Sequence, residues 1–349
     1  MQNFLSSRAR VTAPYTAGAQ PQDIDIIKLN TNENPYPPSP EAIQAYQDFD
    51  ASRLRLYPHP EGGELRAAVS ALTGLPNSHV FCGNGSDEVL GIAFLAFFDG
   101  SILFPDITYS FYKVWAQLYH ISYTLLPLND DFTIPVDQLR AQGGIVLANP
   151  NAPTGIALPL SDVETVLKNN PDCVVIVDEA YSAFGGESAD KLVPKYPNLI
   201  VVHTMSKSHA LAGLRAAYAL GQPHLIDGLT RVKDCFNSYP LDAAAQHMAA
   251  AALSDVPYYA DITQKVIFTR DRTAERLRGL GFDVLPSSTN FLFATKKGAD
   301  APRLKAWLEK SHIYVRHFAV PRISQYLRIT VGTDEQMDRL IDRIAAFPG

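Results

Sequence analysis

The 349-residue sequence has few cysteines, no long apolar run and no excess of positive charge, and each shortage excludes a class of protein. Its three cysteines, Cys82, Cys173 and Cys235, are widely separated, which argues against a disulfide framework or paired zinc ligands and predicts a reducing compartment. No apolar run approaches the roughly 20 residues that cross a bilayer. The net charge of −6 argues against a nucleic-acid-binding protein, which usually carries a basic excess.

Two recognisable sequence signals are also missing. The nine histidines are scattered and none lies in an HExxH arrangement, so we expect no metal. The first 18 residues lack the apolar core of a secretory signal, and we expect a cytoplasmic protein. With 46% hydrophobic and 19% charged residues, the chain can bury a large core.

Short apolar runs alternate with helical stretches from about residue 79 onward. The runs lie at 79–83, 101–105, 144–150, 174–181, 199–206 and 216–221. Their continuous apolar character indicates strands buried on both faces, and therefore an α/β fold with a mainly parallel central sheet covered by helices. Functional residues are then expected at the strand ends and in the loops that follow.

The remaining stretches predict three parts of the chain. Residues 1–28 are expected to form an irregular N-terminal arm, 29–245 a large domain and 246–349 a smaller α+β domain. Helices are expected near 40–48 and 61–74, with Gly74 as a C-cap, and a long helical region over 223–280 contains the domain boundary.

The segment GNGSDE (83–88) predicts an anion site. Two glycines allow a sharp turn, and Ser86 or Asp87 can cap the helix that follows, whose first N–H groups attract a phosphate. An ordinary strand–turn–helix connection has the same features. The lysine of a Walker loop is missing, which disfavours a nucleoside triphosphate.

Two further segments follow predicted strands. Tyr109 begins a helix, where its ring could stack on a flat ligand, although most such tyrosines are simply half-buried. ANPNAPTG (148–155) predicts a rigid loop, in which the Ala152–Pro153 bond is the candidate for a cis peptide; an ordinary connection rich in turn residues is the alternative.

The most informative segments are VVIVDEAY (174–181) and TMSKSHALAGLR (204–215). Asp178 ends a very apolar strand, so its carboxylate needs a partner or a proton unless it is a helix cap. Lys207 follows another such strand, where burial and positive neighbours would lower its pKa, although a lone lysine at a strand end is usually solvated. Thr204, Ser206 and Arg215 suit a phosphate.

Together these groups match the needs of pyridoxal 5′-phosphate. Lys207 would bond to the cofactor's aldehyde, and Asp178 would keep the pyridine nitrogen protonated so that the ring can accept electrons. The phenol of Tyr181 could hold the ring oxygen. No common alternative cofactor uses a phosphate cradle, a stacking aromatic ring, a buried carboxylate, a phenol and a buried lysine in this order.

From about residue 14 to its end, the chain resembles the fold-type I pyridoxal-phosphate-dependent aminotransferases, and within them the histidinol-phosphate aminotransferases. The resemblance lies in LNTNENPYPPSP, RLYPHP, GNGSDE, NPNAPTG, VDEAY, TMSKSHALAGLR and LRITVG. It implies that Lys207, Asp178 and Tyr181 are catalytic. It also implies that the cofactor contacts are Gly85, Ser86, Asp87, Tyr109, Asn151, Ser206 and Arg215, together with Tyr57 from the other subunit of a homodimer.

The same resemblance places Arg328 and Arg316 at the substrate, with Tyr15 reaching it from the N-terminal arm of the other subunit. One position departs from the pattern: Ala152 stands where many relatives have an asparagine that bonds the ring oxygen, so either Asn151 swings in or Tyr181 acts alone. The implied reaction moves an amino group between glutamate and imidazole-acetol phosphate in histidine biosynthesis. Alternatives are an aromatic-amino-acid aminotransferase, a threonine-phosphate decarboxylase and a cofactor-binding regulator without catalysis.

Overall fold

The structure, a computed structural model, describes residues 4–14, 18, 20, 21 and 25–348. Within these residues, seven strands form the larger of two sheets. They are β2 (Val80–Gly83), β3 (Ile102–Pro105), β4 (Tyr123–Leu126), β5 (Ile145–Ala148), β6 (Val175–Asp178), β7 (Leu199–Thr204) and β8 (Ala217–Gly221). Their order across the sheet is β2-β8-β7-β6-β5-β3-β4. All are parallel from β7 to β4, and β8 is antiparallel to both neighbours. The prediction of a mainly parallel sheet is confirmed.

Helices cover both faces of this sheet because the side chains of its strands alternate between the faces. Val175 and Val177 of β6 belong to one apolar cluster and Ile176 to the other. The first cluster includes residues of α3 (Gly63–Thr73), α6 (Leu160–Asn169) and α8 (Ala243–Ser254), and the second includes residues of α4 (Gly85–Phe97), α5 (Phe111–Leu118) and α7 (Pro223–Phe236). Burial on both faces explains the unbroken apolar runs of the sequence.

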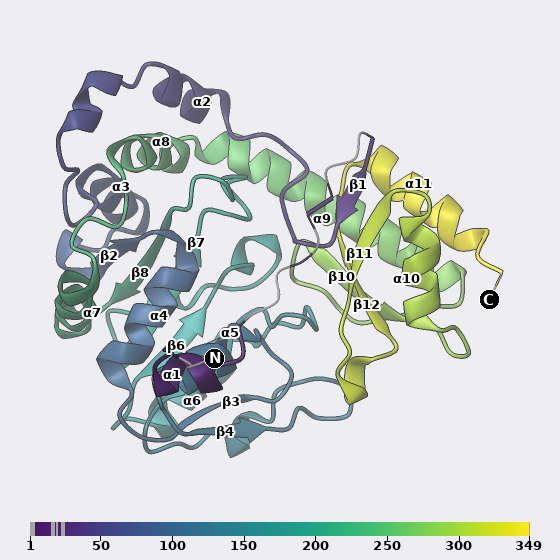
Figure 1. Cartoon of the computed structure of the whole chain (residues 1–349), viewed down its shortest axis with the longest axis horizontal. Coiled ribbons are helices and arrows are strands. Elements are labelled where there is room, and N and C mark those ends of the chain that lie inside the picture. The colour runs from purple at the N-terminus through teal and green to yellow at the C-terminus, as the bar shows by residue number, and fades with distance from the viewer. Residues whose placement is uncertain (1–3, 15–17, 19, 22–24, 349) are drawn as a thin grey trace.

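A second sheet has the order β1-β11-β12-β10-β9. Its strands are β1 (Ile27–Leu29), β9 (Asp283–Val284), β10 (Phe291–Thr295), β11 (Ile313–His317) and β12 (Tyr326–Thr330). It packs with α9 (Val256–Gly279), α10 (Ala301–Glu309) and α11 (Asp334–Ala345) around a third apolar cluster. In Figure 1 this sheet lies to the right of the larger one, and α9 runs between the two.

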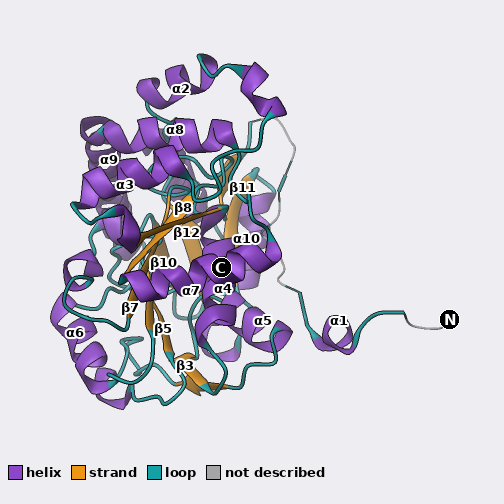
Figure 2. Cartoon of the chain, turned by 90° about the vertical axis from the view of Figure 1, so that its left-hand side faces the viewer, coloured by secondary structure: helices purple, strands orange, loops and turns teal. Residues whose placement is uncertain are grey.

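Several short elements connect these layers. They are α1 (Ser7–Val11), α2 (Pro40–Gln47) and the 3-10 turns η1 (Ala51–Arg55), η2 (Asn77–His79), η3 (Val136–Gln138), η4 (Ser182–Phe184), η5 (Ala189–Leu192) and η6 (Pro321–Ile323). The helix predicted near 40–48 is confirmed by α2, and the one at 61–74 by α3 with Gly74 as its C-cap. Figure 2 shows α1 projecting from the rest of the chain.

The helical region predicted over 223–280 consists of the three helices α7, α8 and α9. Asp242 caps α8 by accepting from the N–H of Ala245, and Asp255 caps α9 in the same way through Tyr258. The first part of α9 belongs to the core of the large sheet and its last part to that of the small sheet. The division at residues 28/29 and 245/246 stays a prediction. Within the described residues, every helix is too short or too polar to span a bilayer.

Candidate functional site

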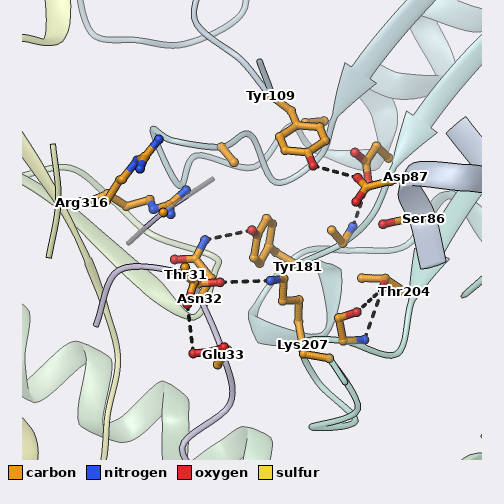
Figure 3. Close-up of a pocket in the computed structure, with 18 of the residues that line it drawn as sticks. Thr31, Asn32, Glu33, Ser86, Asp87, Tyr109, Tyr181, Thr204, Lys207 and Arg316 are labelled. Atoms are coloured by element: carbon orange, nitrogen blue, oxygen red, sulfur yellow. Dashed lines mark hydrogen bonds between the residues drawn. The ribbon is translucent and has the colours of Figure 1, made fainter. Parts of the chain in front are cut away.

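The carboxyl ends of three parallel strands meet at one pocket. Ala148 ends β5, Asp178 ends β6 and Thr204 ends β7, and all three residues line it. Segments of the smaller sheet close the other side (Figure 3). Ten residues that the sequence nominated line this one pocket: Ser86, Asp87, Tyr109, Asp178, Tyr181, Ser206, Lys207, Arg215, Arg316 and Arg328.

Lys207 lies on the loop after β7 with its ammonium group pointing at the segment 31–33 (Figure 3). Its Nζ donates to the carbonyl of Thr31 at 3.3 Å, and the Asn34 amide donates to the Lys207 carbonyl at 2.9 Å. Burial, followed by the nearby positive charge of Arg328, lowers the Lys207 pKa from 10.5 to about 8. A substantial share of neutral amine, the form required of a nucleophile, is therefore present near neutral pH.

Asp178 is buried at the end of β6, where its carboxylate accepts from the Tyr112 hydroxyl at 2.8 Å and from the Ala180 N–H at 3.3 Å. Burial raises its pKa to about 6, although the Tyr112 hydrogen bond favours the charged form. Sequence reasoning missed Tyr112. The signal was its spacing of three residues from Tyr109. The helix α5 begins at Phe111, so Tyr109 precedes the helix that it was expected to begin, and its ring meets that of Tyr112 edge to face with centroids 5.6 Å apart.

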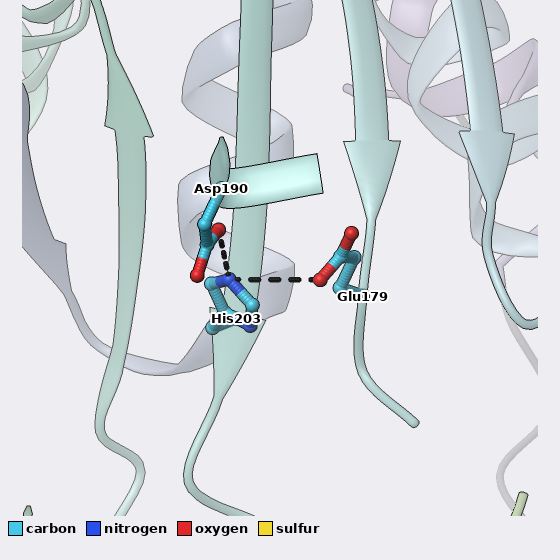
Figure 4. A group of neighbouring side chains, drawn as sticks. All are labelled: Glu179, Asp190 and His203. Carbon is cyan, nitrogen blue, oxygen red and sulfur yellow. Dashed lines mark hydrogen bonds and ion pairs between the residues drawn. The ribbon is translucent and has the colours of Figure 1, made fainter. Parts of the chain in front are cut away.

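A cluster of charged side chains lies beside the end of β6: Glu179 directly follows Asp178, His203 lies on β7 and Asp190 lies on η5. His203 Nε2 lies 2.8 Å from an Asp190 oxygen and 3.8 Å from Oε2 of Glu179 (Figure 4). Burial alone would lower the His203 pKa, but the two carboxylates outweigh burial and raise it to about 9. Although the three groups lie close enough for a metal ion, the imidazolium already supplies the positive charge that the carboxylates need.

The start of α4 forms an anion cradle. The prediction that Ser86 or Asp87 caps this helix is wrong: α4 begins at Gly85, and the side chain of its N-cap residue, Asn84, makes no capping hydrogen bond. The first N–H groups are therefore left for a ligand. Gly85 has φ +79°, and a Cβ there would overlap the guanidinium of Arg215, so this position requires glycine.

Further donors surround the cradle. Arg215 lies 3.5 Å from the Asp87 carboxylate, which also accepts from the Tyr109 hydroxyl at 2.8 Å. The hydroxyl of Ser206 accepts from Thr204 at 3.0 Å and can donate into the pocket. Helix N–H groups, hydroxyls and a guanidinium on one side of the pocket suit a phosphate, and Lys207 and Asp178 lie beyond them. The residues present therefore fit pyridoxal 5′-phosphate.

The loop 148–155 departs from one expectation. The Ala152–Pro153 bond is cis, as predicted, and so is Asn149–Pro150. Asn151, however, does not line the pocket: its amide donates to the Ile107 carbonyl and to Thr154, and its oxygen accepts from Thr108. These bonds hold Asn151 away, and Ala152 lines the pocket instead.

The two arginines of the smaller sheet face each other across a strand pair. Arg316 on β11 and Arg328 on β12 are directly opposed in the antiparallel register, and both line the pocket. The two guanidinium charges repel each other, and both attract a negatively charged group in the pocket. Arg328 is also fixed by donating from its Nη2 to the Asn30 carbonyl at 2.9 Å. The arrangement therefore favours a negatively charged ligand.

Besides Asn151, the nominated residues Gly85 and Tyr57 do not line the pocket of this chain. Tyr57 is 83% exposed and stacks on Tyr239 with ring centroids 4.7 Å apart, and Tyr15 lies outside the described residues. Conversely, four consecutive lining residues were not nominated: Asn30, Thr31, Asn32 and Glu33. They belong to LNTNENPYPPSP, a segment that carried the family resemblance but no predicted role.

Comparisons with known proteins agree with this geometry. Residues 24–344 match the family model described as aminotransferase class I and II. The chain is 51% identical over 356 residues to histidinol-phosphate aminotransferase 2 of Dechloromonas aromatica, covering 100% of both chains. It is also 51% identical to the histidinol-phosphate aminotransferase of Marinomonas sp. (strain MWYL1), covering 97% of this chain and 98% of that one.

A solved structure shows the same fold. It is histidinol-phosphate aminotransferase from Sinorhizobium meliloti in complex with pyridoxal-5′-phosphate, with a TM-score of 0.82 and 24% identity over 91% of this chain and 90% of that one. The match to the family model spans nearly the whole chain. The chain therefore belongs to the class I and II aminotransferase family.

Proposed function

We propose that this protein is a histidinol-phosphate aminotransferase that uses pyridoxal 5′-phosphate. It transfers an amino group between glutamate and imidazole-acetol phosphate, giving 2-oxoglutarate and histidinol phosphate. Full-length relatives of this name at about half identity support the substrate. The observation that carries the proposal is Lys207, with a lowered pKa, in one pocket with Asp178 and an opposed pair of arginines.

Different residues have different roles at the cofactor. When bound, pyridoxal phosphate supplies an electron-accepting ring that stabilises negative charge on the substrate carbon. Lys207 would attach the cofactor and, as a free amine, would move the proton at that carbon. Asp178 would hold the ring nitrogen, Tyr109 would pack against the ring, and the start of α4 with Ser206 and Arg215 would hold the phosphate.

Charge selects the substrate. Arg316 and Arg328 hold its anionic end, because both positively charged side chains line the pocket from opposed positions of one strand pair. Both arginines also line a second pocket, beside Tyr109, which includes Lys113 and Phe318. An extended substrate with an apolar ring and a second anionic group suits such a continuation of the site. Tyr15 is assigned to the same end.

The active unit is a homodimer in the cytoplasm. Large apolar side chains are exposed together near η1 and the end of α7: Leu54, Leu56, Tyr57, Phe236 and Tyr239. Exposed apolar residues of this size are typical of an interface. We assign Tyr57 to the phosphate site of the second copy, because in its own chain it does not line the pocket.

A half-reaction screen tests the function. The protein carrying pyridoxal phosphate is mixed with glutamate, histidinol phosphate, phenylalanine or threonine phosphate, and the conversion of its absorbance band to that of the amine form is followed. We expect conversion by glutamate and by histidinol phosphate, with phenylalanine much slower. Faster conversion by phenylalanine would make the protein an aromatic-amino-acid aminotransferase, and carbon dioxide release from threonine phosphate would make it a decarboxylase.

A further inference from the structure

Asn32 connects the smaller sheet to Tyr181 at the floor of the pocket. It is 1% exposed and has φ +56°, a left-handed conformation that only a well-fixed residue keeps. Its backbone N–H donates to Thr330 Oγ1 at 3.0 Å, and its carbonyl accepts from the Asn290 amide at 3.0 Å. Its side-chain Nδ2 donates to the Tyr181 hydroxyl at 2.9 Å (Figure 3).

The surrounding bonds decide which end of the Asn32 amide faces Tyr181. The Thr330 hydroxyl already accepts from the Asn32 N–H, so its own proton is available to donate to Asn32 Oδ1, at 2.9 Å. That bond fixes the oxygen of the amide on the Thr330 side. The NH₂ group is therefore left for Tyr181, and the Tyr181 oxygen is the acceptor.

This direction determines what Tyr181 can do for a ligand. Because its oxygen accepts from Asn32, and no described residue accepts the proton of its hydroxyl, that proton is available to an acceptor in the pocket. The same bond favours the phenolate and so opposes the rise in the Tyr181 pKa that burial causes. Asn32 thus makes Tyr181 a more acidic and better oriented donor.

We propose that Asn32 is a positioning residue, which orients Tyr181 as a hydrogen-bond donor to the ring oxygen of the cofactor. The proposal rests on the proposed function for the identity of that cofactor. It also explains how the ring oxygen can be bonded although position 152 is an alanine instead of an asparagine. The nearest amide of that loop, on Asn151, is bonded elsewhere, so Tyr181 backed by Asn32 is the donor that the described residues provide.

Affinity for two probes separates a positioning role from a general structural one. The probes are pyridoxamine phosphate and its analogue without the ring hydroxyl, neither of which bonds covalently to Lys207. We expect wild-type protein to bind pyridoxamine phosphate at least about tenfold more tightly, the usual effect of one charge-assisted hydrogen bond. Asn32→Ala should reduce this preference about three- to tenfold, because it removes one neutral bond that supports the donor.

Two controls complete the experiment. Asn290→Ala removes a bond to the backbone of Asn32 and leaves the contact with Tyr181, so it should preserve the preference. Tyr181→Phe should abolish the preference, and adding Asn32→Ala to it should change nothing further. Such non-additivity is expected only if Asn32 acts through Tyr181.

The outcomes separate this inference from the proposed function. If Asn32→Ala weakens both probes equally, so that the preference is unchanged while the half-reactions persist, the positioning role is wrong and the proposed function stands. The same holds if Asn290→Ala reduces the preference as much as Asn32→Ala. If wild-type protein binds neither probe, both the inference and the proposed function are wrong.

Discussion

The lowered pKa of Lys207 predicts an amine that reacts at neutral pH. With a pKa of about 8, about 9% of the Lys207 side chains are neutral at pH 7. At the ordinary value of 10.5 the neutral fraction would be about 0.03%, so burial and Arg328 together increase the reactive form about 300-fold. The neutral fraction of Lys207 should reach one half near pH 8.

Competitive acylation measures this fraction directly. Cofactor-free protein is treated with a trace of acetic anhydride between pH 6 and 10, and mass spectrometry compares the labelling of Lys207 with that of Lys297, an exposed lysine in the same chain. We expect the Lys207 labelling to level off above about pH 8 while the reference is still rising. A Lys207 profile with its midpoint near 10.5 would refute the reasoning, because burial would then have had no effect.

An arginine variant tests the second cause of the shift. Arg328→Gln removes the positive charge whose repulsion disfavours the Lys207 ammonium, so the midpoint should move to higher pH. Arg231→Gln removes an equal charge from an exposed ion pair with Asp227 and should leave the midpoint unchanged. Equal shifts in both variants would mean that net charge, not the neighbouring guanidinium, sets the reactivity.

Three further predictions concern the cofactor and the interface. Asp178→Asn should stabilise the cofactor-free protein by up to about 3 kcal/mol above pH 6, because the raised pKa of Asp178 makes its ionisation in the folded state unfavourable there. Below pH 3.8 the carboxyl is protonated in both the folded and the unfolded state, and the variant should gain nothing. Urea unfolding at pH 7.5 and at pH 4 measures the difference, and a gain independent of pH would contradict the prediction. Gly85→Ala should weaken cofactor binding at least about tenfold by displacing Arg215, whereas Gly213→Ala, which meets open space, should not; fluorescence titration compares the two. Leu56→Asp should shift the dimer toward monomer in sedimentation, and an unaltered dimer would remove that face from the proposed interface.

The local motifs of the chain could be interpreted from the sequence because each is a short run of residues that meets one physical requirement. Apolar runs predicted six of the seven strands of the larger sheet and missed β4, which lies at the sheet edge and is only partly buried. The polar residues that end the runs predicted where the pocket lies. Lys207 and Asp178 could be nominated because a charged side chain at the end of a buried strand is costly to bury unless it is paired or neutral. The cis bond before Pro153 also followed from local sequence.

Contacts between distant segments were decided only by the tertiary structure. Asn32 and Thr330 lie 298 residues apart, and no periodicity relates them. The opposition of Arg316 and Arg328 depends on the register of two strands, which is fixed by core packing around them rather than by either strand. The N-cap position of α4 is Asn84 rather than Ser86, because the backbone turn at Gly85 sets where the helix begins.

The sequence by itself therefore determined the kind of chemistry, because reactive side chains at the ends of buried strands are a local pattern. The tertiary structure decided how those side chains are oriented. Lys207, Tyr181 and Arg328 are all held by the segment 30–34, which crosses from one sheet to the other. Its hydrogen bonds form only when both sheets are in place, since Lys207 and Tyr181 follow strands of the larger sheet and Arg328 lies on β12 of the smaller one.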